Sequence, residues 1–183
     1  MSFAELHADA LAVLDRWAPA DPAQESLRQA YISYLLGMPD AMARSCAPGH
    51  LTASAVVVDP SRDATLLTLH PRIGRWVQLG GHCEPDDAGL RAAAEREARE
   101  ESGIDDLRIG ELPLQLDVHP LTCSGGVPTR HLDVRYLVIA PSGADPVISD
   151  ESDDLRWFAF DRLPGGLDAS THALLIAARR AMT

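Results

Sequence analysis

The stretch Gly80–Ile104, GGHCEPDDAGLRAAAEREAREESGI, decides how the rest of this sequence is interpreted. On a helix that turns by about 100° per residue, Glu97, Glu100 and Glu101 fall on one face. The apolar residues that share this face are Leu90, Ala93 and Ala94. Like-charged carboxylates on an inward face are costly unless something compensates them. A hard divalent cation, which prefers oxygen ligands, would resolve the conflict.

The turn signals around this helix favour the packed arrangement over the alternative of a solvated charged helix. The opposite face carries charged residues at i,i+4 spacing, as expected where a helix meets water: Arg91, Glu95 and Arg99. Asp86 or Asp87 is expected to cap the start of the helix, and Gly103 to end it.

Residues 96–104, REAREESGI, resemble the second half of the Nudix hydrolase box at every fixed position. The family pattern is G-x5-E-x7-R-E-U-x-E-E-x-G-U, where U is aliphatic. Gly81 matches the first glycine, Asp87 stands where the pattern has Glu, and the spacing from Asp87 to Arg96 is one residue longer. Because the extra residue precedes the helix, the register of the three carboxylates survives.

The resemblance implies roles for the box residues. Glu97 and Glu101 are the expected metal ligands, with Glu100 third and the Gly80 carbonyl as a further ligand. Arg96 would orient the glutamates and pair with Asp87 or Glu84. The general base would be a box glutamate or a carboxylate on a distant loop, for which Glu151 is our candidate.

Four residues are candidates for substrate contact: His82, Glu84, His131 and Asp133. His82 follows the two glycines and would either touch a phosphate or cap the turn. His131 and Asp133 alternate along a predicted strand and therefore share one face. They would either line the pocket or form a surface pair on an edge strand. His50 and Cys83 are interpreted as structural residues.

Composition excludes several classes of protein. The chain has 183 residues, of which 46% are hydrophobic and 23% charged, which is typical of a soluble globular protein. Its net charge of −11 and pI of about 4.9 argue against nucleic acid as a partner. Three scattered cysteines without a CxxC motif, no apparent signal peptide and no membrane-spanning stretch predict a cytoplasmic protein.

Hydrophobic periodicity and turn signals predict the remaining elements. Helices are expected at residues 3–18, 21–36, 39–44 and 169–181. Strands are expected at residues 51–58, 64–70, 75–79, 107–118, 131–140 and 155–160. Residues 119–130, with two prolines and two glycines, are expected to form a long loop of functional importance.

The irregular alternation of strands and helices favours an α+β fold over a doubly wound parallel sheet. The Nudix resemblance covers roughly residues 48–182 and implies an α/β/α sandwich with a mixed sheet. The predicted organisation is a helical N-terminal extension, residues 1–47, followed by a hydrolase domain, residues 48–183, that ends in a helix. The extension is interpreted as packed against the domain; the alternatives are a wall of the substrate pocket or a homodimer surface.

The resemblance implies a MutT-like pyrophosphohydrolase. Its expected reaction is hydrolysis of the diphosphate linkage in a nucleoside diphosphate joined to a sugar, an ADP-ribose-like group or a nucleotide. Mg²⁺ is the expected cofactor, with Mn²⁺ as an alternative, and neither nucleic acid nor membrane is an expected partner. Two other functions stay open: a non-catalytic Nudix-like sensor domain, and an enzyme like isopentenyl diphosphate isomerase. All three box glutamates are present, which disfavours the first, and we find no segments with the Cys and Glu that the second requires.

Overall fold

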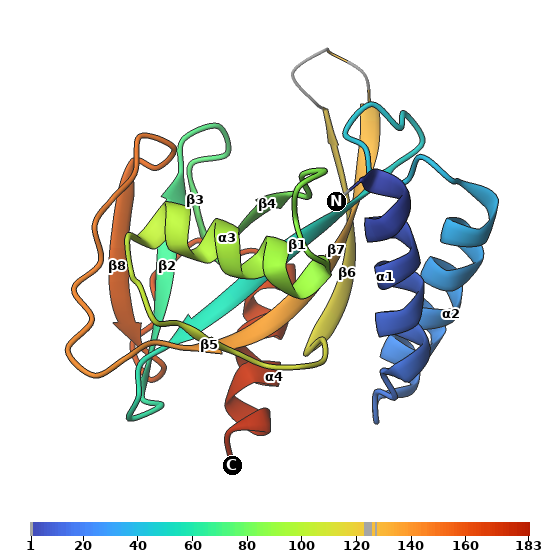
Figure 1. Ribbon diagram of the computed structural model, residues 1–183. Helices are drawn as coiled ribbons and strands as arrows, with labels where there is room; N and C mark the ends of the chain where they lie inside the picture. Colours follow the sequence, from blue (N-terminus) through green and yellow to red (C-terminus); the bar gives the residue numbers. More distant parts are fainter. Residues whose placement is uncertain (1, 123–125, 127) are drawn as a thin grey trace.

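The computed structural model describes residues 2–122, 126 and 128–183, and these form a sheet with helices on both faces (Figure 1). The helices are α1 (Phe3–Arg16), α2 (Pro22–Gly37), α3 (Leu90–Ser102) and α4 (Ala169–Ala181). The strands are β1 (His50–Val58), β2 (Ala64–His70), β3 (Arg75–Val77), β4 (Leu79–His82), β5 (Arg108–Ile109), β6 (Gln115–Thr122), β7 (Pro128–Ile139) and β8 (Asp154–Ala159).

Strand β1 lies at the centre of the sheet, and all nine of its residues are buried. It runs parallel to β7 along its whole length and antiparallel to β2 and β4. The other strands attach to these neighbours: β3 and β8 pair with β2, while β5 and β6 pair with β7. One parallel pair among antiparallel pairs makes this a mixed sheet, as predicted.

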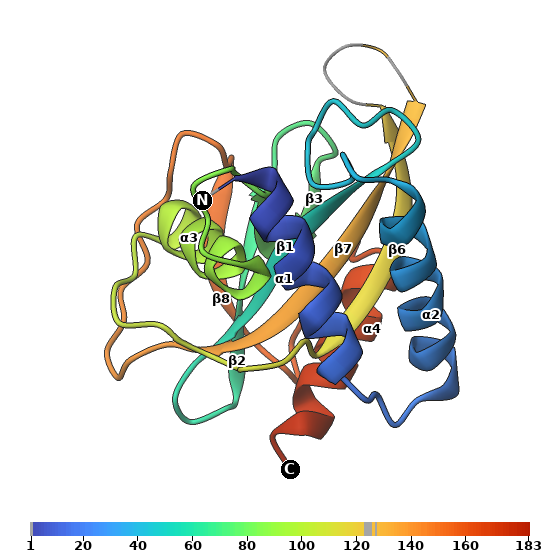
Figure 2. The same cartoon turned by 45° about the vertical axis from the view of Figure 1, so that its right-hand side comes forward.

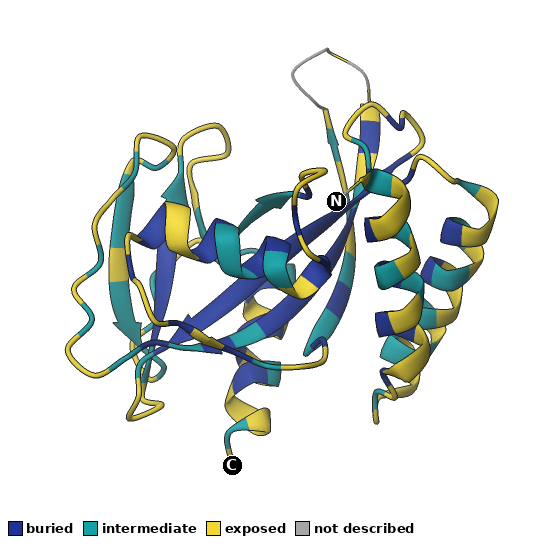
Figure 3. Ribbon diagram, in the orientation of Figure 1, coloured by how far each residue is buried: buried dark blue, intermediate teal, exposed yellow. Residues whose placement is uncertain are grey.

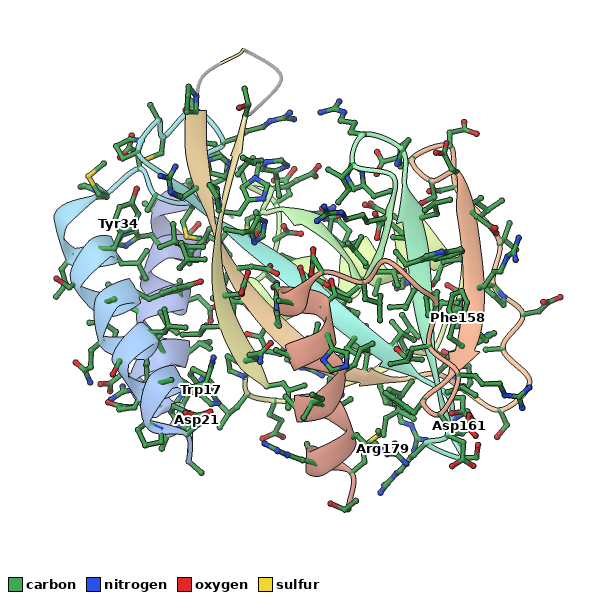
Figure 4. The ribbon with its side chains drawn as sticks, turned by 180° about the vertical axis from the view of Figure 1, so that it is seen from behind. Trp17, Asp21, Tyr34, Phe158, Asp161 and Arg179 are labelled. Carbon is green, nitrogen blue, oxygen red and sulfur yellow. The ribbon has the colours of Figure 1, made fainter. Side chains whose placement is uncertain are left out.

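The alternation of side chains along β1 gives the sheet two apolar faces. Ala53, Ala55 and Val57 belong to the core cluster that includes the inner face of α3. Val56 and Val58 pack instead with residues of α4, which crosses the opposite face of the sheet (Figure 4). The predicted α/β/α sandwich with a C-terminal helix is therefore confirmed.

Helices α1 and α2 lie side by side at one end of the sandwich (Figures 1 and 2). Their apolar residues join the same core cluster as β1 and α3, and the inward sides of both helices are buried (Figure 3). The Tyr31 hydroxyl donates to the backbone carbonyl of Asp117 at 2.6 Å, and Gln24 bonds both backbone groups of Leu116. The division of the chain at residue 47 stays a prediction. No helix in the described part of the chain has the length and apolar composition that crossing a membrane requires.

Two predicted strands are interrupted. The strand predicted at 75–79 breaks at Gln78, because β3 pairs with β2 whereas β4 pairs with β1. The strand predicted at 107–118 becomes β5 and β6, with residues 110–114 between them.

Two further elements differ from the sequence prediction. Residues 39–44 form successive turns instead of a helix, closed by short-range backbone bonds such as that from the Ala43 amide to the Asp40 carbonyl. Most of the predicted loop at 119–130 is strand, because β6 and β7 continue as a hairpin to Thr122 and Pro128. Pro120 fits there because β6 pairs with β7 alone among the described strands, and an edge strand tolerates a missing amide donor. Cys123 and its neighbours 124, 125 and 127 lie outside the described residues.

Candidate active site

Helix α3 turns two of its three box glutamates toward the sheet. Glu97 and Glu101 are only 8% and 9% exposed, whereas the Glu100 side chain is 59% exposed. Leu90, Ala93, Ala94 and Ala98 on the same helix are fully buried. The predicted inward face is therefore confirmed for Glu97 and Glu101, and Glu100 stands at its edge.

The two glycines of β4 allow the glutamates to approach the backbone closely. The Gly80 amide donates to the Glu101 carboxylate at 2.9 Å. A Cβ atom on Gly81 would lie 2.8 Å from the Glu97 carboxylate, closer than side-chain contacts permit. Gly80 has φ of +146°, and a Cβ there would meet Ser54 and the Ala53 carbonyl. Gly80 therefore requires glycine for geometric reasons, whereas a side chain at Gly81 would displace the Glu97 carboxylate.

The Arg96 guanidinium links the loop before α3 to the glutamates. It donates to both carboxylate oxygens of Asp87, at 2.8 and 3.1 Å, and to the His82 carbonyl at 2.9 Å. It also donates to Glu97 at 3.0 Å and to Glu100 at 2.9 Å. The contact between Asp87 and Arg96 therefore forms although Asp has a shorter side chain than the Glu of the family pattern and the spacing between the two residues is one residue longer.

The start of α3 differs from the prediction. Neither Asp86 nor Asp87 caps the helix, because α3 begins only at Leu90 and Gly89 occupies the capping position without a side chain. Asp87 is instead buried, and its carboxylate accepts the Glu84 amide and Arg96. The capping carboxylate comes from α1: the Leu90 amide donates to Asp9 at 2.9 Å. Gly103 ends the helix in the left-handed conformation, as predicted.

Burial makes the two inner glutamates costly to ionise together. It raises the pKa of Glu97 to about 7, against the opposing effect of Arg96. Burial likewise raises the pKa of Glu101 to about 8, and the neighbouring carboxylates Glu97 and Glu151 add to the effect. A divalent cation among these oxygens would relieve both penalties, so this donor set fits Mg²⁺ or Mn²⁺.

The glutamates open into a cleft of about 1050 Å³. Its walls include α3, β4 and the loop before β8, which contributes Glu151. The predicted candidates Gly80, His82, Glu84, Glu97, Glu100, Glu101, Arg96, His131, Asp133 and Glu151 all line it. The structure thus brings these residues together, whereas their chemical roles stay predictions.

A buried polar network forms the floor of the cleft, and sequence reasoning missed most of it. Arg135 is 2% exposed and donates to Asp133 at 2.8 Å and to the Ser170 hydroxyl of α4 at 2.7 Å. Asp133 also accepts the hydroxyls of Thr52 and Ser54 at 3.0 and 2.7 Å. The interpretation of His131 and Asp133 as an edge-strand surface pair is wrong, because β7 lies between β1 and β6 and Asp133 is 1% exposed.

A pattern of period two could have identified this floor from the sequence. Polar residues alternate along β1, β6 and β7: His50, Thr52 and Ser54; Gln115, Asp117 and His119; His131, Asp133 and Arg135. Side chains two residues apart share one face of a strand. Each triplet interrupts an otherwise apolar strand, which is the signal of a polar patch on one face of the sheet.

Comparison with known proteins identifies the family. The family model for the NUDIX domain matches residues 48–178. A NUDIX-family hydrolase from Clostridium perfringens shares 21% identity, with a TM-score of 0.60 over 73% of this chain and 98% of that one. The MutT NUDIX hydrolase from Burkholderia pseudomallei shares 26% identity, with a TM-score of 0.53 over 70% and 97% of the two chains.

A third structure was solved with a ligand. The NUDIX domain of NrtR from Shewanella oneidensis, in complex with ADP ribose, shares 20% identity, with a TM-score of 0.56 over 73% of this chain and 88% of that one. No curated protein in the comparison matches the sequence. Since the family model spans well over half of the residues and the solved structures share the fold, the chain belongs to the NUDIX domain family.

Proposed function

We propose that the protein hydrolyses the diphosphate linkage of a nucleoside diphosphate joined to a second group, with a divalent cation as cofactor. The observation that carries this proposal is the pair of buried carboxylates, Glu97 and Glu101, held against two glycines at the wall of a large polar cleft. The complex of a similar NUDIX domain with ADP ribose supports the substrate class.

In this proposal, the residues around the box have two roles, metal binding and positioning of the metal ligands. Glu97 and Glu101 would hold Mg²⁺ or Mn²⁺, with Glu100 and the Gly80 carbonyl as further ligands. When bound, such an ion neutralises charge on the diphosphate oxygens and lowers the pKa of a coordinated water. Arg96 fixes Glu97 and Glu100 in place through its hydrogen bonds to both.

Glu151 is the proposed general base. It lies on the loop before β8 and lines the same cleft as the glutamates of α3. Its carboxylate would accept a proton from the attacking water as the water oxygen bonds to phosphorus and the anhydride P–O bond breaks. The products are two phosphorylated fragments and a released proton.

The floor residues have a supporting role in this proposal. The Asp133 carboxylate already accepts hydrogen bonds from Thr52, Ser54 and Arg135, so we assign it to positioning of the floor instead of direct contact with substrate. His82, Glu84 and His131 line the cleft and are the proposed contacts to the substrate.

Incubation of the purified protein with ADP-ribose, dinucleoside polyphosphates, nucleoside diphosphate sugars and nucleoside triphosphates tests the proposal. We expect Mg²⁺-dependent release of two phosphorylated products from at least one diphosphate-linked compound, with ¹⁸O from labelled water in one of them. Full turnover after exhaustive treatment with EDTA would contradict the metal requirement. Tight binding without turnover of any compound would favour a non-catalytic sensor domain, and double-bond migration in an isoprenoid diphosphate would favour an isomerase.

A further inference from the structure

Three imidazoles converge at one end of the polar floor, and two of them, His82 and His131, also line the cleft. They are His50 of β1, His82 of β4 and His131 of β7. The register of the sheet places them side by side, because His50 pairs with His131 and Thr52, two residues further along β1, pairs with His82. The ring centroids are 4.9 to 5.1 Å apart.

The three side chains share an unusual deficit of hydrogen bonds. The Nε2 atoms of His50, His82 and His131 are all buried, and none has a hydrogen-bond partner among the described residues. His50 itself is only 1% exposed. A buried polar atom is normally satisfied, so three unpartnered nitrogens in one cluster require an explanation. Ordinary packing would place apolar side chains at these positions.

The surroundings of His50 leave its Nε2 lone pair free to bind a ligand. Its Nδ1 atom lies 3.4 Å from the Cys46 carbonyl, which can only accept a hydrogen bond. Nδ1 therefore carries the proton, and Nε2 is the unprotonated nitrogen. A hydrogen bond from the second ring nitrogen to a carbonyl is the usual support of a metal-bound histidine.

The spacing of the ring nitrogens suits a single metal ion. One nitrogen from each histidine lies within 4.8 Å of the other two. A tetrahedral ion at about 2.1 Å from each nitrogen requires separations of about 3.4 Å, which modest side-chain rotations would provide. We propose that His50, His82 and His131 form a second metal site, for an ion of the Zn²⁺ class, with a fourth position that opens into the cleft.

The donor set distinguishes this site from the carboxylate site on α3. Imidazole nitrogens suit zinc, copper, nickel and iron, whereas Mg²⁺ prefers oxygen. The negative charge of Asp133, two residues from His131, favours the binding of a cation here. The positive charge of Arg44, an exposed residue, disfavours it. His82 and His131 line the cleft, so water or a phosphate oxygen could take the fourth position. The ion would also tie β4 and β7 to β1. This inference does not depend on the proposed hydrolysis.

Titration of the tag-free full-length protein with Co²⁺, after removal of metals by chelation and in excess Mg²⁺, tests the proposal. We expect one equivalent of Co²⁺ to bind with the intense visible absorption of a tetrahedral complex, and Zn²⁺ to displace it. His82→Asn and His131→Asn should each weaken binding by at least ~100-fold, since each removes a ligand and effects of 10–100-fold are typical even of residues behind the ligands.

Two control variants separate the sites. His172→Asn alters an exposed histidine on α4 and should leave Co²⁺ binding unchanged. Glu101→Gln should also leave it unchanged, because it alters only the carboxylate site. Circular dichroism checks that each variant is folded. If one of the two histidine variants does not fold, the other alone is enough to test the loss of Co²⁺ binding. Absence of a tetrahedral complex, binding that survives both histidine substitutions, or binding that is lost in Glu101→Gln would overturn the proposal.

Discussion

The glutamates of α3 differ in their exposure to water, and this difference predicts their ranking in catalysis. We expect Glu97→Gln and Glu101→Gln each to lower kcat by at least ~100-fold, because the amide cannot supply the charge that a hard cation requires. Glu100→Gln should cost less, since the Glu100 side chain is 59% exposed and stands at the edge of the site. Steady-state kinetics of the purified variants measures the ranking.

Arg99→Gln is the matched control for this series. Arg99 lies on the same helix, and its exposed side chain pairs with Asp105 at the surface. Surface ion pairs contribute little to stability, so the variant should retain near wild-type kcat. Equal damage from Arg99→Gln and Glu101→Gln would mean that the assignment of the site to the inner face of α3 is wrong.

Asp87 is expected to hold Arg96 in position, because its carboxylate is buried and accepts two hydrogen bonds from Arg96. Asp87→Ala should lower the free energy of unfolding by about 2–3 kcal/mol, since it leaves a partly buried guanidinium with fewer partners. Activity should fall while Mn²⁺ affinity weakens by no more than about 10–100-fold, the range typical of a residue behind the ligands. Urea unfolding and calorimetric titration measure the two quantities.

Asp105→Ala is the control for Asp87→Ala, because it removes an exposed aspartate that forms an ion pair with Arg99. Its expected effect on unfolding is below about 0.5 kcal/mol. A steep loss of Mn²⁺ affinity in Asp87→Ala would show that Asp87 is itself a metal ligand. A variant with unchanged stability and activity would show that the bonds to Arg96 are dispensable.

At the scale of elements, the start of α3 depends on a residue of α1. The Leu90 amide donates to Asp9, and Gly89 provides no side chain of its own for capping. Asp9→Ala should therefore lower the free energy of unfolding by about 1 kcal/mol, as loss of a helix cap usually does. Urea unfolding measures this loss. The control is Asp15→Ala, which alters an exposed aspartate one residue before the end of α1. Equal stability of the two variants would contradict a capping role for Asp9.

The sequence predicted those elements whose signals are local. Helix α4 begins and ends where its turn residues predict, and β2 has the predicted bounds. The break at Gln78 was not predictable in this way, because it arises from a change of pairing partner between β2 and β1. The hairpin of β6 and β7 was likewise hidden, since Pro120 is a loop signal in isolation but is tolerated on an edge strand.

The same distinction applies to the site. The carboxylate face of α3 follows from helical spacing alone, so Glu97 and Glu101 could be predicted. The floor is assembled from strands distant in sequence: Thr52 reaches Asp133, and Asp117 reaches Arg135, only because β1 and β6 both pair with β7. Its contacts therefore depend on sheet register, which the sequence specifies only through the whole fold.

At the scale of the whole molecule, the buried glutamates predict a pH dependence for the metal-free protein. The pKa values of Glu97 and Glu101 rise to about 7 and about 8 from the ordinary glutamate value of 4.5. Folding then favours the protonated forms, so their contribution to stability is complete below pH 4.5 and is lost as the pH rises through 7 to 8. In EDTA, these two glutamates should lower the free energy of unfolding by about 6 kcal/mol between about pH 5 and pH 8.5.

Urea unfolding at several pH values measures this dependence, and Glu101→Gln provides the comparison. The variant carries no titrating group at position 101, so its stability should fall less over the same range. Saturating Mn²⁺ should flatten the wild-type profile if the ion compensates the two charges. Identical profiles of the wild type and Glu101→Gln in EDTA would contradict the inferred burial cost.

The hydrogen bond from Leu90 to Asp9 has a consequence for protein engineering. The cap of the box helix is encoded 81 positions before the amide that it satisfies, in a segment that precedes the part matched by the family model. A graft of the box into another scaffold would carry Gly89 but leave its capping carboxylate behind. A chimera that exchanges α1 for the helix of a relative must therefore keep an acidic side chain at this point, or provide a new cap at the transplanted junction.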